Sequence, residues 1–272
     1  MSANDDIQDE SQAILDVDMG NSRMKWRLLS REGAHIRFQD YGFQDNGFQD
    51  NGFQEHGVQD YDDGNGFSFA GLNVVPKRVR VSSVVVDQRR DQFIQHCNRQ
   101  WYLTPEFARV QRHCGGVTQA YKDPGRLGVD RWLGLLAAFK QHGGCVLVSC
   151  GSAVTLDLLA NDGRHLGGYI VPGLAMMHRA LFTGTDGVKV EMAREFDDLH
   201  PGLDTETAVH KGTMAMIKGL VEHGVSEYRA ATGASPPLLI TGGDGATVRG
   251  FLAAKAIYNP YLVLDGLAVA LP

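Results

Sequence analysis

The sequence predicts an α/β fold built from two similar halves. Apolar strands alternate with amphipathic helices along the chain, a pattern typical of layered α/β proteins. Each half begins with a strand, a turn that combines glycine with Asn or Ser, and a returning strand, at residues 14–29 and 145–159. The 272 residues are enough for two ordinary domains, each with a core of its own.

The first half opens on a predicted hairpin. Residues 14–18 form its first strand, residues 19–22 are a turn by composition, and residues 24–29 form the returning strand. Further along the chain we expect, in order, a strand at 79–86, a helix at 88–101, a short strand at 118–121 and a helix at 132–141.

A five-residue repeat follows the hairpin. Its units read QDYGF, QDNGF and QDNGF, and it decays through residues 54–58. A period of five fits neither a helix nor a strand, and Gly, Asn and Asp favour turns. We therefore expect residues 39–66 to form an extruded, disordered loop whose deletion leaves activity intact. The recurring Asp and Asn residues lack the spacing of an EF-hand calcium loop.

The second half repeats the opening pattern. A strand at 145–149, a small-residue turn at 150–152 and a returning strand at 153–159 are followed by a third strand at 165–171. The remaining elements that we expect are helices at 172–181 and 206–231, a strand at 237–241 ending in a glycine cluster at 242–245, a helix at 246–256, and a strand at 261–264 before a short terminal helix.

Composition and charge exclude several classes of protein. The chain carries 26 Lys and Arg against 32 Asp and Glu with no basic block, so we expect no nucleic-acid partner. The first 12 residues are polar and acidic, unlike a signal peptide, and no run approaches the ~20 apolar residues of a membrane span. The four cysteines form no CxxC pair, which favours a reduced, cytoplasmic protein.

Three glycine-containing turns, at 18–22, 151–153 and 242–245, are candidates for binding a nucleotide. A turn of small residues exposes N–H groups that converge on an anion, and glycine lets a phosphate approach the backbone closely. Asp18 can orient a metal ion or water near the phosphates, and Lys25 can neutralise a terminal phosphate. Each turn alone is better explained as an ordinary connection, but the co-occurrence of all three favours a nucleotide.

Asp130 is the candidate general base. It precedes Arg131 at a predicted helix start, where a structural role as N-cap or first-turn residue is the alternative. As a base, its carboxylate would accept a proton from an alcohol while Arg131 holds an anionic group, an arrangement that suits phosphoryl transfer. The chain contains no P-loop motif, no GxSxG elbow, no HExxH and no strand-linked GxGxxG.

These motifs resemble, in order, those of the type III pantothenate kinases. The first phosphate motif of that family resembles residues 18–26 (DMGNSRMKW), and its substrate and catalytic segment resembles residues 121–124 and 127–132 (YKDP and LGVDRW). The second phosphate motif resembles residues 151–157 (GSAVTLD), and two further family segments resemble residues 167–173 and 204–212. The matches span residues 14 to about 265, and the GVDRW and DxGNS…KW segments are the specific ones.

The resemblance implies the superfold shared by acetate and sugar kinases, heat-shock ATPases and actin. It implies duplicated ribonuclease H-like, actin-like domains with a cleft between them, at residues 12–142 (including the loop at 39–66) and 143–272. It further implies a cytoplasmic transferase, a kinase that uses ATP to phosphorylate pantothenate in the first step of coenzyme A biosynthesis. Members of the family are homodimers with the pantothenate site at the subunit interface, require a monovalent cation such as potassium or ammonium, and use Mg²⁺ with the nucleotide.

The family's site residues carry over by motif. The implied ATP-binding residues are Asp18, Met19, Gly20, Asn21, Ser22, Arg23, Met24, Lys25 and Ser152. The implied pantothenate-binding residues are Tyr121, Gly128, Val129, Asp130, Arg131 and Thr205, with Asp130 as the proton acceptor. Many members have Asp, a ligand of the monovalent ion, where Ser149 stands here; a neutral hydroxyl supplies less charge, and the metal-binding residues are not identified.

Two alternatives stay open from the sequence. Relatives called Bvg accessory factors have been associated with transcription, so the first alternative is a non-catalytic regulator on the same fold. The second is a kinase acting on a different small molecule. The presence of Asp18, Lys25, Asp130 and Arg131 favours an enzyme, because a scaffold needs no such set.

Overall fold

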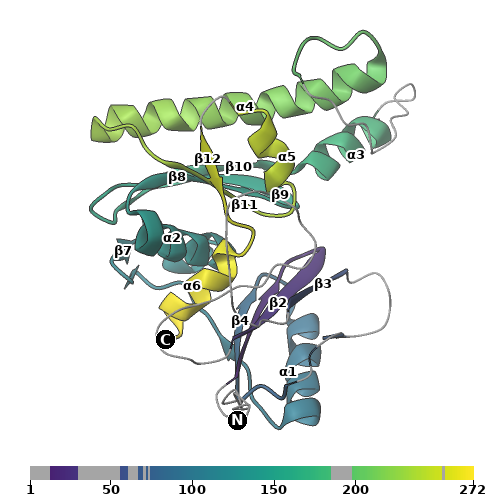
Figure 1. The fold of residues 1–272 in the computed structure, drawn as a ribbon, viewed down its shortest axis with the longest axis vertical. Coiled ribbons are helices and arrows are strands. Elements are labelled where there is room, and N and C mark those ends of the chain that lie inside the picture. The colour runs from purple at the N-terminus through teal and green to yellow at the C-terminus, as the bar shows by residue number, and fades with distance from the viewer. Residues whose placement is uncertain are drawn as a thin grey trace, which may run out of the picture. The chain divides into compact units, whose positions relative to one another are not determined.

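The computed structural model describes residues 13–29, 56–60, 67–69, 72, 74–184, 198–252 and 255–272. The chain forms two compact units: unit 1 is Met1–Arg109 with Leu271–Pro272, and unit 2 is Val110–Ala270 (Figure 1). The expected boundary at residues 142–143 differs from this division, because the helix that precedes it packs against strands of unit 2.

Unit 1 is a five-stranded sheet packed against one face of a helix. Its elements are β1 (Ile14–Met19), β2 (Arg23–Leu29), β3 (His56–Asp60), β4 (Arg78–Ser83), α1 (Asp87–Trp101) and β5 (Glu106–Phe107). The strand order is β3-β2-β1-β4-β5, in which β1 pairs antiparallel with β2 and parallel with β4. Apolar side chains of β1, β2 and β4 form the core together with Phe93 and Cys97 of α1.

The hairpin predicted at residues 14–29 is confirmed. The backbone N–H of Gly20 donates to the carbonyl oxygen of Arg23 at 3.1 Å, and Met19 stands opposite Met24 in the ladder. The next pair of residues in that ladder is Asp18 and Lys25. The turn between the strands is therefore short and polar, as the composition indicates.

Part of the repeat tract is a strand, which corrects the prediction for residues 39–66. Residues His56–Asp60 form β3, the edge strand that pairs antiparallel with β2 from Arg23 to Arg27. The polar, Gly-containing composition did not indicate this strand, because an edge strand needs pairing along only one side. The rest of the tract lies outside the described residues.

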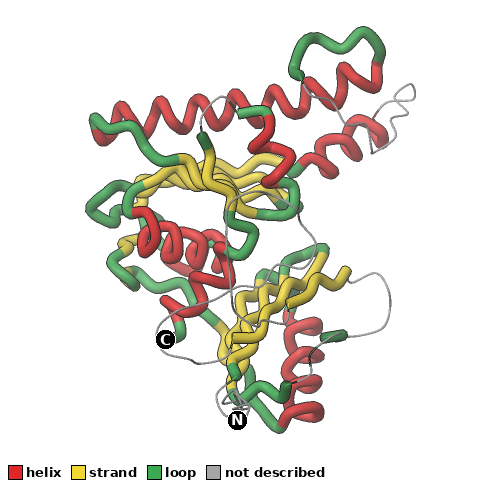
Figure 2. Tube along the Cα trace, in the orientation of Figure 1, coloured by secondary structure: helices red, strands yellow, loops and turns green. Residues whose placement is uncertain are grey.

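Unit 2 is a five-stranded sheet covered on both faces. The sheet consists of β8 (Cys145–Cys150), β9 (Ala153–Leu159), β10 (His165–Pro172), β11 (Leu238–Thr241) and β12 (Ala256–Tyr258). The helices are α2 (Val129–His142), α3 (Leu174–Gly184), α4 (Thr205–Thr232), α5 (Gly245–Gly250) and α6 (Leu262–Ala270), and a short hairpin consists of β6 (His113–Cys114) and β7 (Val117–Thr118). Helices α2 and α6 lie on one side of the sheet, and α4 and α5 on the other (Figures 1 and 2).

The two main sheets have the same topology, which bears out the predicted duplication. The order β10-β9-β8-β11-β12 repeats the order β3-β2-β1-β4-β5. Strands β1 and β2 form an antiparallel hairpin in one sheet, as β8 and β9 do in the other. The first strand of each hairpin also pairs in parallel with a later strand, β1 with β4 and β8 with β11. The α/β fold with duplicated domains follows from this repetition.

Three predictions near the ends of elements are wrong. Residues 261–264 do not form a strand, since α6 begins at Leu262. The last strand of the sheet is instead β12, at the end of the segment predicted as a helix at 246–256. The strand expected at 118–121 is reduced to β7. Short apolar runs do not distinguish a strand from a helix by periodicity, so neighbouring elements decide.

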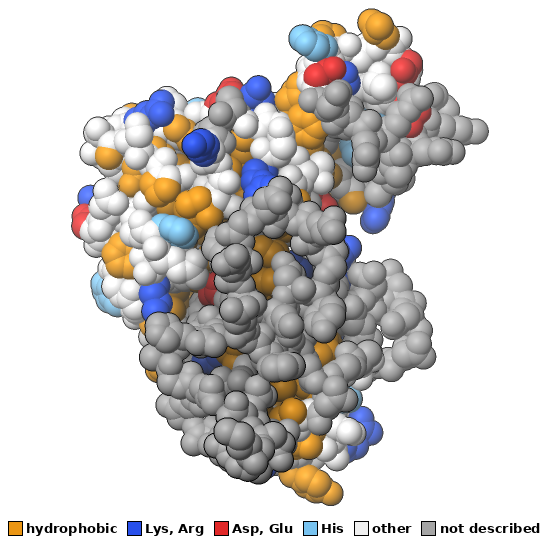
Figure 3. All heavy atoms as spheres, viewed as in Figure 1, with side chains coloured by type: hydrophobic (Ala, Val, Ile, Leu, Met, Phe, Trp, Pro, Cys, Tyr) orange, Lys and Arg blue, Asp and Glu red, His pale blue; other side chains and the backbone are white. Residues whose placement is uncertain are grey.

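The surface of the described residues is mixed. Charged side chains of both signs lie singly among neutral and hydrophobic ones on the face shown in Figure 3. None of the helices formed by the described residues is both long enough and apolar enough to span a bilayer.

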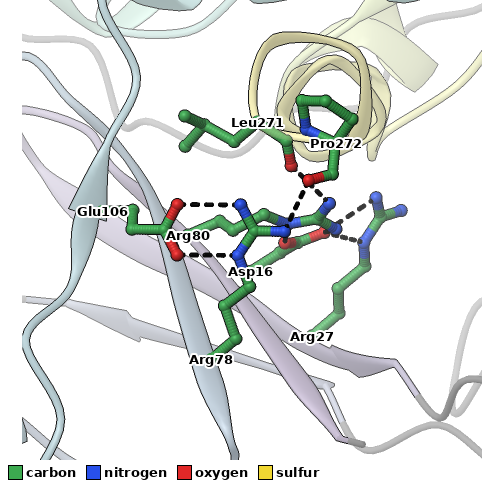
Figure 4. Close-up of polar contacts among 7 residues, drawn as sticks. All are labelled: Asp16, Arg27, Arg78, Arg80, Glu106, Leu271 and Pro272. Atoms are coloured by element: carbon green, nitrogen blue, oxygen red, sulfur yellow. Dashed lines mark hydrogen bonds and ion pairs between the residues drawn. The ribbon is translucent and has the colours of Figure 1, made fainter.

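A buried ionic cluster ties the central strands of unit 1 together (Figure 4). The Asp16 carboxylate on β1 is fully buried and stands opposite Arg27 of β2 and Arg80 of β4 in the two ladders. It accepts hydrogen bonds from Arg80 Nε at 2.7 Å and from Arg27 Nε at 3.2 Å. Because an unpaired charge is costly to bury, the three side chains require one another.

The same cluster holds the last residues of the sequence. Arg80 Nη1 donates to the Leu271 carbonyl oxygen at 3.0 Å. Arg78 donates to both carboxylate oxygens of Glu106 and, through Nη1, to Pro272 O at 2.8 Å. These contacts explain why Leu271 and Pro272 belong to unit 1, although α6 belongs to unit 2.

We predict that Asp16→Asn destabilises the protein by about 3–5 kcal/mol, because it leaves Arg27 and Arg80 buried without a compensating charge. Urea unfolding followed by circular dichroism measures this loss. The matched control is Asp162→Asn, since Asp162 pairs with Arg164 at 2.7 Å on an exposed turn and its removal should leave the unfolding midpoint unchanged. Equal midpoints for Asp16→Asn and the wild type would contradict the assigned role of the cluster.

Two deletions in the repeat tract should differ in stability, because only one of them removes β3. Removing residues 39–66 deletes β3 and exposes the backbone of β2, so we predict a lower urea midpoint than in the wild type. Removing only residues 39–53 keeps β3, and we predict that its urea midpoint matches that of the wild type. The order of the two midpoints is the test, and a 39–53 deletion that is as unstable as the longer one would refute the prediction.

Candidate active site

The glycine turns of unit 2 converge at the carboxyl ends of two parallel strands. The turn between β8 and β9 is closed by the Gly151 N–H, which donates to Ala153 O at 3.0 Å. The Gly173 N–H at the start of α3 donates to Ser152 O at 3.1 Å, and the Asp244 N–H after β11 donates to Cys150 O at 3.2 Å. The turns predicted separately at 151–153 and 242–245 are therefore neighbours.

Glycine is required at this convergence. Gly242 has a φ of 94°, and a Cβ there would meet the backbone of Cys150, with its nitrogen at 2.7 Å. A Cβ on Gly173 would lie 2.7 Å from the Ser152 carbonyl oxygen. Ser152 itself is exposed, so its side chain and the surrounding backbone are accessible to a ligand. Such a cradle of small residues suits a phosphate group.

The first glycine turn lies in unit 1. Asn21, Ser22 and Arg23 are exposed at the tip of the β1–β2 hairpin, and Gly20 is partly exposed beside them. The side chains of Met19 and Met24, by contrast, are fully buried in the core of unit 1. Of the expected ATP-binding residues, these two can therefore offer only their backbone to a ligand.

Asp130 lies in the first turn of α2, and its carboxylate folds back on the start of the helix. Gly128 is the N-cap, and Asp130 Oδ1 accepts the Arg131 backbone N–H at 2.8 Å. A Cβ on Gly128 would lie 2.6 Å from that Oδ1, so glycine makes room for the carboxylate. The alternative role as N-cap is excluded, whereas the first-turn position is confirmed. Burial raises the pKa of Asp130 above its ordinary value, although the Arg131 N–H and charge partly oppose the shift.

Arg131 points into a buried network. Its Nε and Nη2 donate to the two oxygens of Asp157 on β9, at 3.0 and 2.6 Å, and its Nη1 donates to the Tyr121 hydroxyl at 2.9 Å. Burial acts to lower the pKa of Arg131, but the hydrogen bonds and charge of Asp157 outweigh it and raise that pKa. Arg131 is therefore held as a cation in a fixed orientation.

His165 completes this network. Its Nε2 lies 2.9 Å from Asp157 Oδ1, and its ring stacks on that of Tyr121 with centroids 6.3 Å apart and an angle of 14°. Both His165 and Asp157 are almost fully buried. Asp157 is the last residue of the segment that resembles the second phosphate motif, but no role was predicted for it or for His165. The signal for Asp157 was an acidic residue inside the mostly apolar strand at 153–159.

Thr205 lies apart from these contacts. It is the exposed first residue of α4, which Asp204 caps by accepting the Thr207 N–H at 2.8 Å. Together with residues of α3 and α4 such as Leu181 and Met216, it lines a cavity of about 530 Å³. Among the described contacts of the Arg131 network, none involves Thr205. The structure thus brings together Tyr121, Asp130 and Arg131 but not Thr205.

The position of Ser149 bears on cation binding. Within the described part of the chain, no group of three or more His, Cys, Asp or Glu residues is arranged to hold a metal. Ser149 lies near the end of β8, opposite Thr155 of β9 and Thr241 of β11 in the two ladders. All three residues carry neutral hydroxyl groups.

Comparison with known proteins identifies a family that matches most of the chain. The family model for type III pantothenate kinase matches residues 14–227. A type III pantothenate kinase from Cellvibrio japonicus is 37% identical over 258 residues, covering 94% of this chain and 96% of the relative. A second, from Chromohalobacter salexigens, is 36% identical over 261 residues, covering 95% of this chain and 87% of the relative.

A solved structure shares the fold. A Baf family transcriptional activator from Campylobacter jejuni superposes with a TM-score of 0.55 at 20% identity, covering 93% of this chain and 95% of that one. The family model and the curated relatives each span most of the chain. On this evidence, the chain belongs to the type III pantothenate kinase family.

Proposed function

We propose that this protein transfers the γ-phosphoryl group of ATP to the terminal hydroxyl of pantothenate, the first step of coenzyme A biosynthesis. The observation that carries the proposal is the first turn of α2, where the Asp130 carboxylate lies beside the oriented cation of Arg131 in a member of this kinase family. The family membership favours this function over the non-catalytic regulator. The solved structure from Campylobacter jejuni supports the fold alone, so its name as a transcriptional activator is no argument for a regulatory function here.

Each group has a role in the transfer. The hydroxyl oxygen of pantothenate attacks the γ-phosphorus, the bond to the β–γ bridging oxygen breaks, and ADP leaves. Asp130 accepts the hydroxyl proton, and its raised pKa suits a proton acceptor near neutral pH. Arg131, with Tyr121, Gly128 and Val129, holds pantothenate, because a guanidinium binds anionic groups. Phosphoryl transfer depends mainly on positioning the reactants and neutralising phosphate charge, so few protein side chains are needed for catalysis.

ATP binds through the glycine turns. Residues 18–25 supply the first phosphate contacts in this proposal, and Ser152 supplies a contact from the second turn. Mg²⁺ arrives with the nucleotide and neutralises phosphate charge. Potassium or ammonium is the proposed activator, bound through neutral oxygens near Ser149, and because Asp is absent there we expect weaker cation affinity than in members that carry it.

The proposed assembly and location follow from the family. A homodimer in which Thr205 of one copy reaches the pantothenate of the other would explain why Thr205 lies apart from the Arg131 network. A cytoplasmic location is supported by the four cysteines, which are all free. No nucleic-acid or membrane partner enters the proposal.

The direct experiment is phosphorylation of pantothenate by purified protein with MgATP, with and without potassium or ammonium. Pantothenate-dependent ADP formation supports the proposal. A panel of other small alcohols tests whether a different substrate is preferred. Absence of turnover with pantothenate under every cation condition would refute the proposed function.

We predict that Asp130→Asn lowers kcat by about 10²–10⁴-fold, because the amide keeps the shape of the side chain but cannot accept the proton. Steady-state kinetics measures the loss, and isothermal titration calorimetry should find ATP binding unchanged. The matched control is Asp87→Asn, an exposed acid in the first turn of α1, which should keep full activity. Turnover at the wild-type rate in Asp130→Asn would exclude Asp130 as the base.

The raised pKa of Asp130 also predicts a pH dependence. A base must be deprotonated, so kcat/KM should fall as the pH decreases through this pKa, and the acid limb should lie above the ordinary aspartate range. A pH–rate profile measures the limb. The residual activity of Asp130→Asn should lack it, and an unchanged limb in that variant would assign the titration to another group.

A further inference from the structure

The Asp157 carboxylate connects Arg131 to a residue outside the substrate segment. Both of its oxygens accept from Arg131, at 3.0 and 2.6 Å, and Oδ1 lies 2.9 Å from His165 Nε2. The three side chains come from α2, β9 and β10. Asp157 and His165 are 1% and 4% exposed and Arg131 is 6% exposed, so the three side chains form one buried network.

The hydrogen bonds determine which nitrogen of His165 carries the proton. The Ala120 backbone N–H points at Nδ1 at 3.4 Å, and because an amide can only donate, Nδ1 must accept. The proton of the neutral ring therefore lies on Nε2, which donates to Asp157 Oδ1. His165 thus accepts a hydrogen bond from the Ala120 backbone, next to Tyr121, and donates one to the Asp157 carboxylate that binds Arg131.

Tyr121 contacts both His165 and Arg131. Its ring stacks on His165, its hydroxyl accepts from Arg131 Nη1, and its backbone N–H donates to Gln119 Oε1 at 2.6 Å. The three hydrogen bonds to Asp157 and Tyr121 use three of the five N–H groups of the guanidinium. No contact among the residues that the structure describes uses the other two N–H groups, and their direction is set by the groups that hold the first three.

The backbone of β10 lies close against the pair. Gly168 of β10 stands opposite Asp157 in the β9–β10 ladder. A Cβ at this position would meet the Leu156 carbonyl and would lie 2.7 Å from Asp157 Oδ1 and 2.9 Å from Arg131 Nη2. Any side chain there would displace the ion pair.

We infer that Asp157 and His165 are positioning residues for the substrate: they fix the direction in which Arg131 and Tyr121 present their remaining donors to the anionic group of pantothenate. This inference rests on the proposed function and deepens it. The inference predicts a change in KM for pantothenate but not in KM for ATP, because the network contacts the proposed pantothenate-binding residues and not the glycine turns proposed to bind ATP.

The test compares two substitutions of His165. His165→Phe keeps a flat ring against Tyr121 but removes both nitrogens, so Asp157 loses a donor and the Ala120 N–H loses its acceptor. His165→Gln keeps an amide N–H donor for Asp157. We expect His165→Phe to raise KM for pantothenate about tenfold with KM for ATP unchanged, and His165→Gln to restore most of the loss. The matched control is His223→Phe, which removes an exposed histidine bonded to Tyr169 at 3.2 Å and should change neither KM.

A spectroscopic measurement makes the test independent of turnover. NMR of the arginine Nε–Hε groups should show a slowly exchanging Arg131 signal, assigned by its loss in Arg131→Lys, in the wild type and His165→Gln and a faster one in His165→Phe. The ring nitrogens of His165 should show the neutral form protonated on Nε2.

The outcomes separate the two claims. If the wild type does not phosphorylate pantothenate, the proposed function fails, and the exchange of the Arg131 signal still tests the positioning. An unchanged pantothenate KM and unchanged Arg131 exchange in His165→Phe would overturn the inference, as would equal rises in both KM values. If His165→Phe does not fold, His165→Gln with wild-type kinetics and a protected Arg131 signal supports the inference, and loss of that protection overturns it.

Discussion

An arginine charge is costly to bury unless a carboxylate is buried with it, and this constraint organises unit 2 around Arg131 and Asp157. The pair joins the first turn of α2 to the central hairpin of the sheet through two charge-assisted hydrogen bonds. Because α2 cannot rotate or slide without breaking them, the position of the neighbouring Asp130 is fixed as well. The candidate base therefore depends on an ion pair in which it takes no part.

Unit 1 uses the same chemistry for a different purpose. Asp16 lies on the central strand of its sheet and is bound by arginines of both neighbouring strands. Arg80 Nη1 also donates to the Leu271 carbonyl oxygen near the end of the sequence. The Asp16 cluster thus joins three neighbouring strands of one sheet. The Arg131–Asp157 pair instead joins a helix to a strand, beside the candidate base Asp130.

Glycine decides where a ligand can approach. In unit 2 the residues Gly173 and Gly242 bring a helix start and a strand end against the Gly151–Ser152 turn, at distances that a Cβ would prevent. Gly128 and Gly168 act in the same way near Asp130 and Asp157. These four glycines therefore serve close packing around the candidate site.

The sequence alone determined the α/β class, the duplication, the two hairpins and the adjacency of Asp130 and Arg131, because these depend on local pattern and on spacing along the chain. Tertiary structure decided the rest. The strand β3, the helical state of residues 262–264 and the short strand β12 depend on which neighbours offer hydrogen bonds, and a short segment does not contain that information. Asp157 and His165 are 26 and 34 positions from Arg131 in the sequence, and only the pairing of β9 with β10 and the packing of α2 on the sheet bring their side chains together.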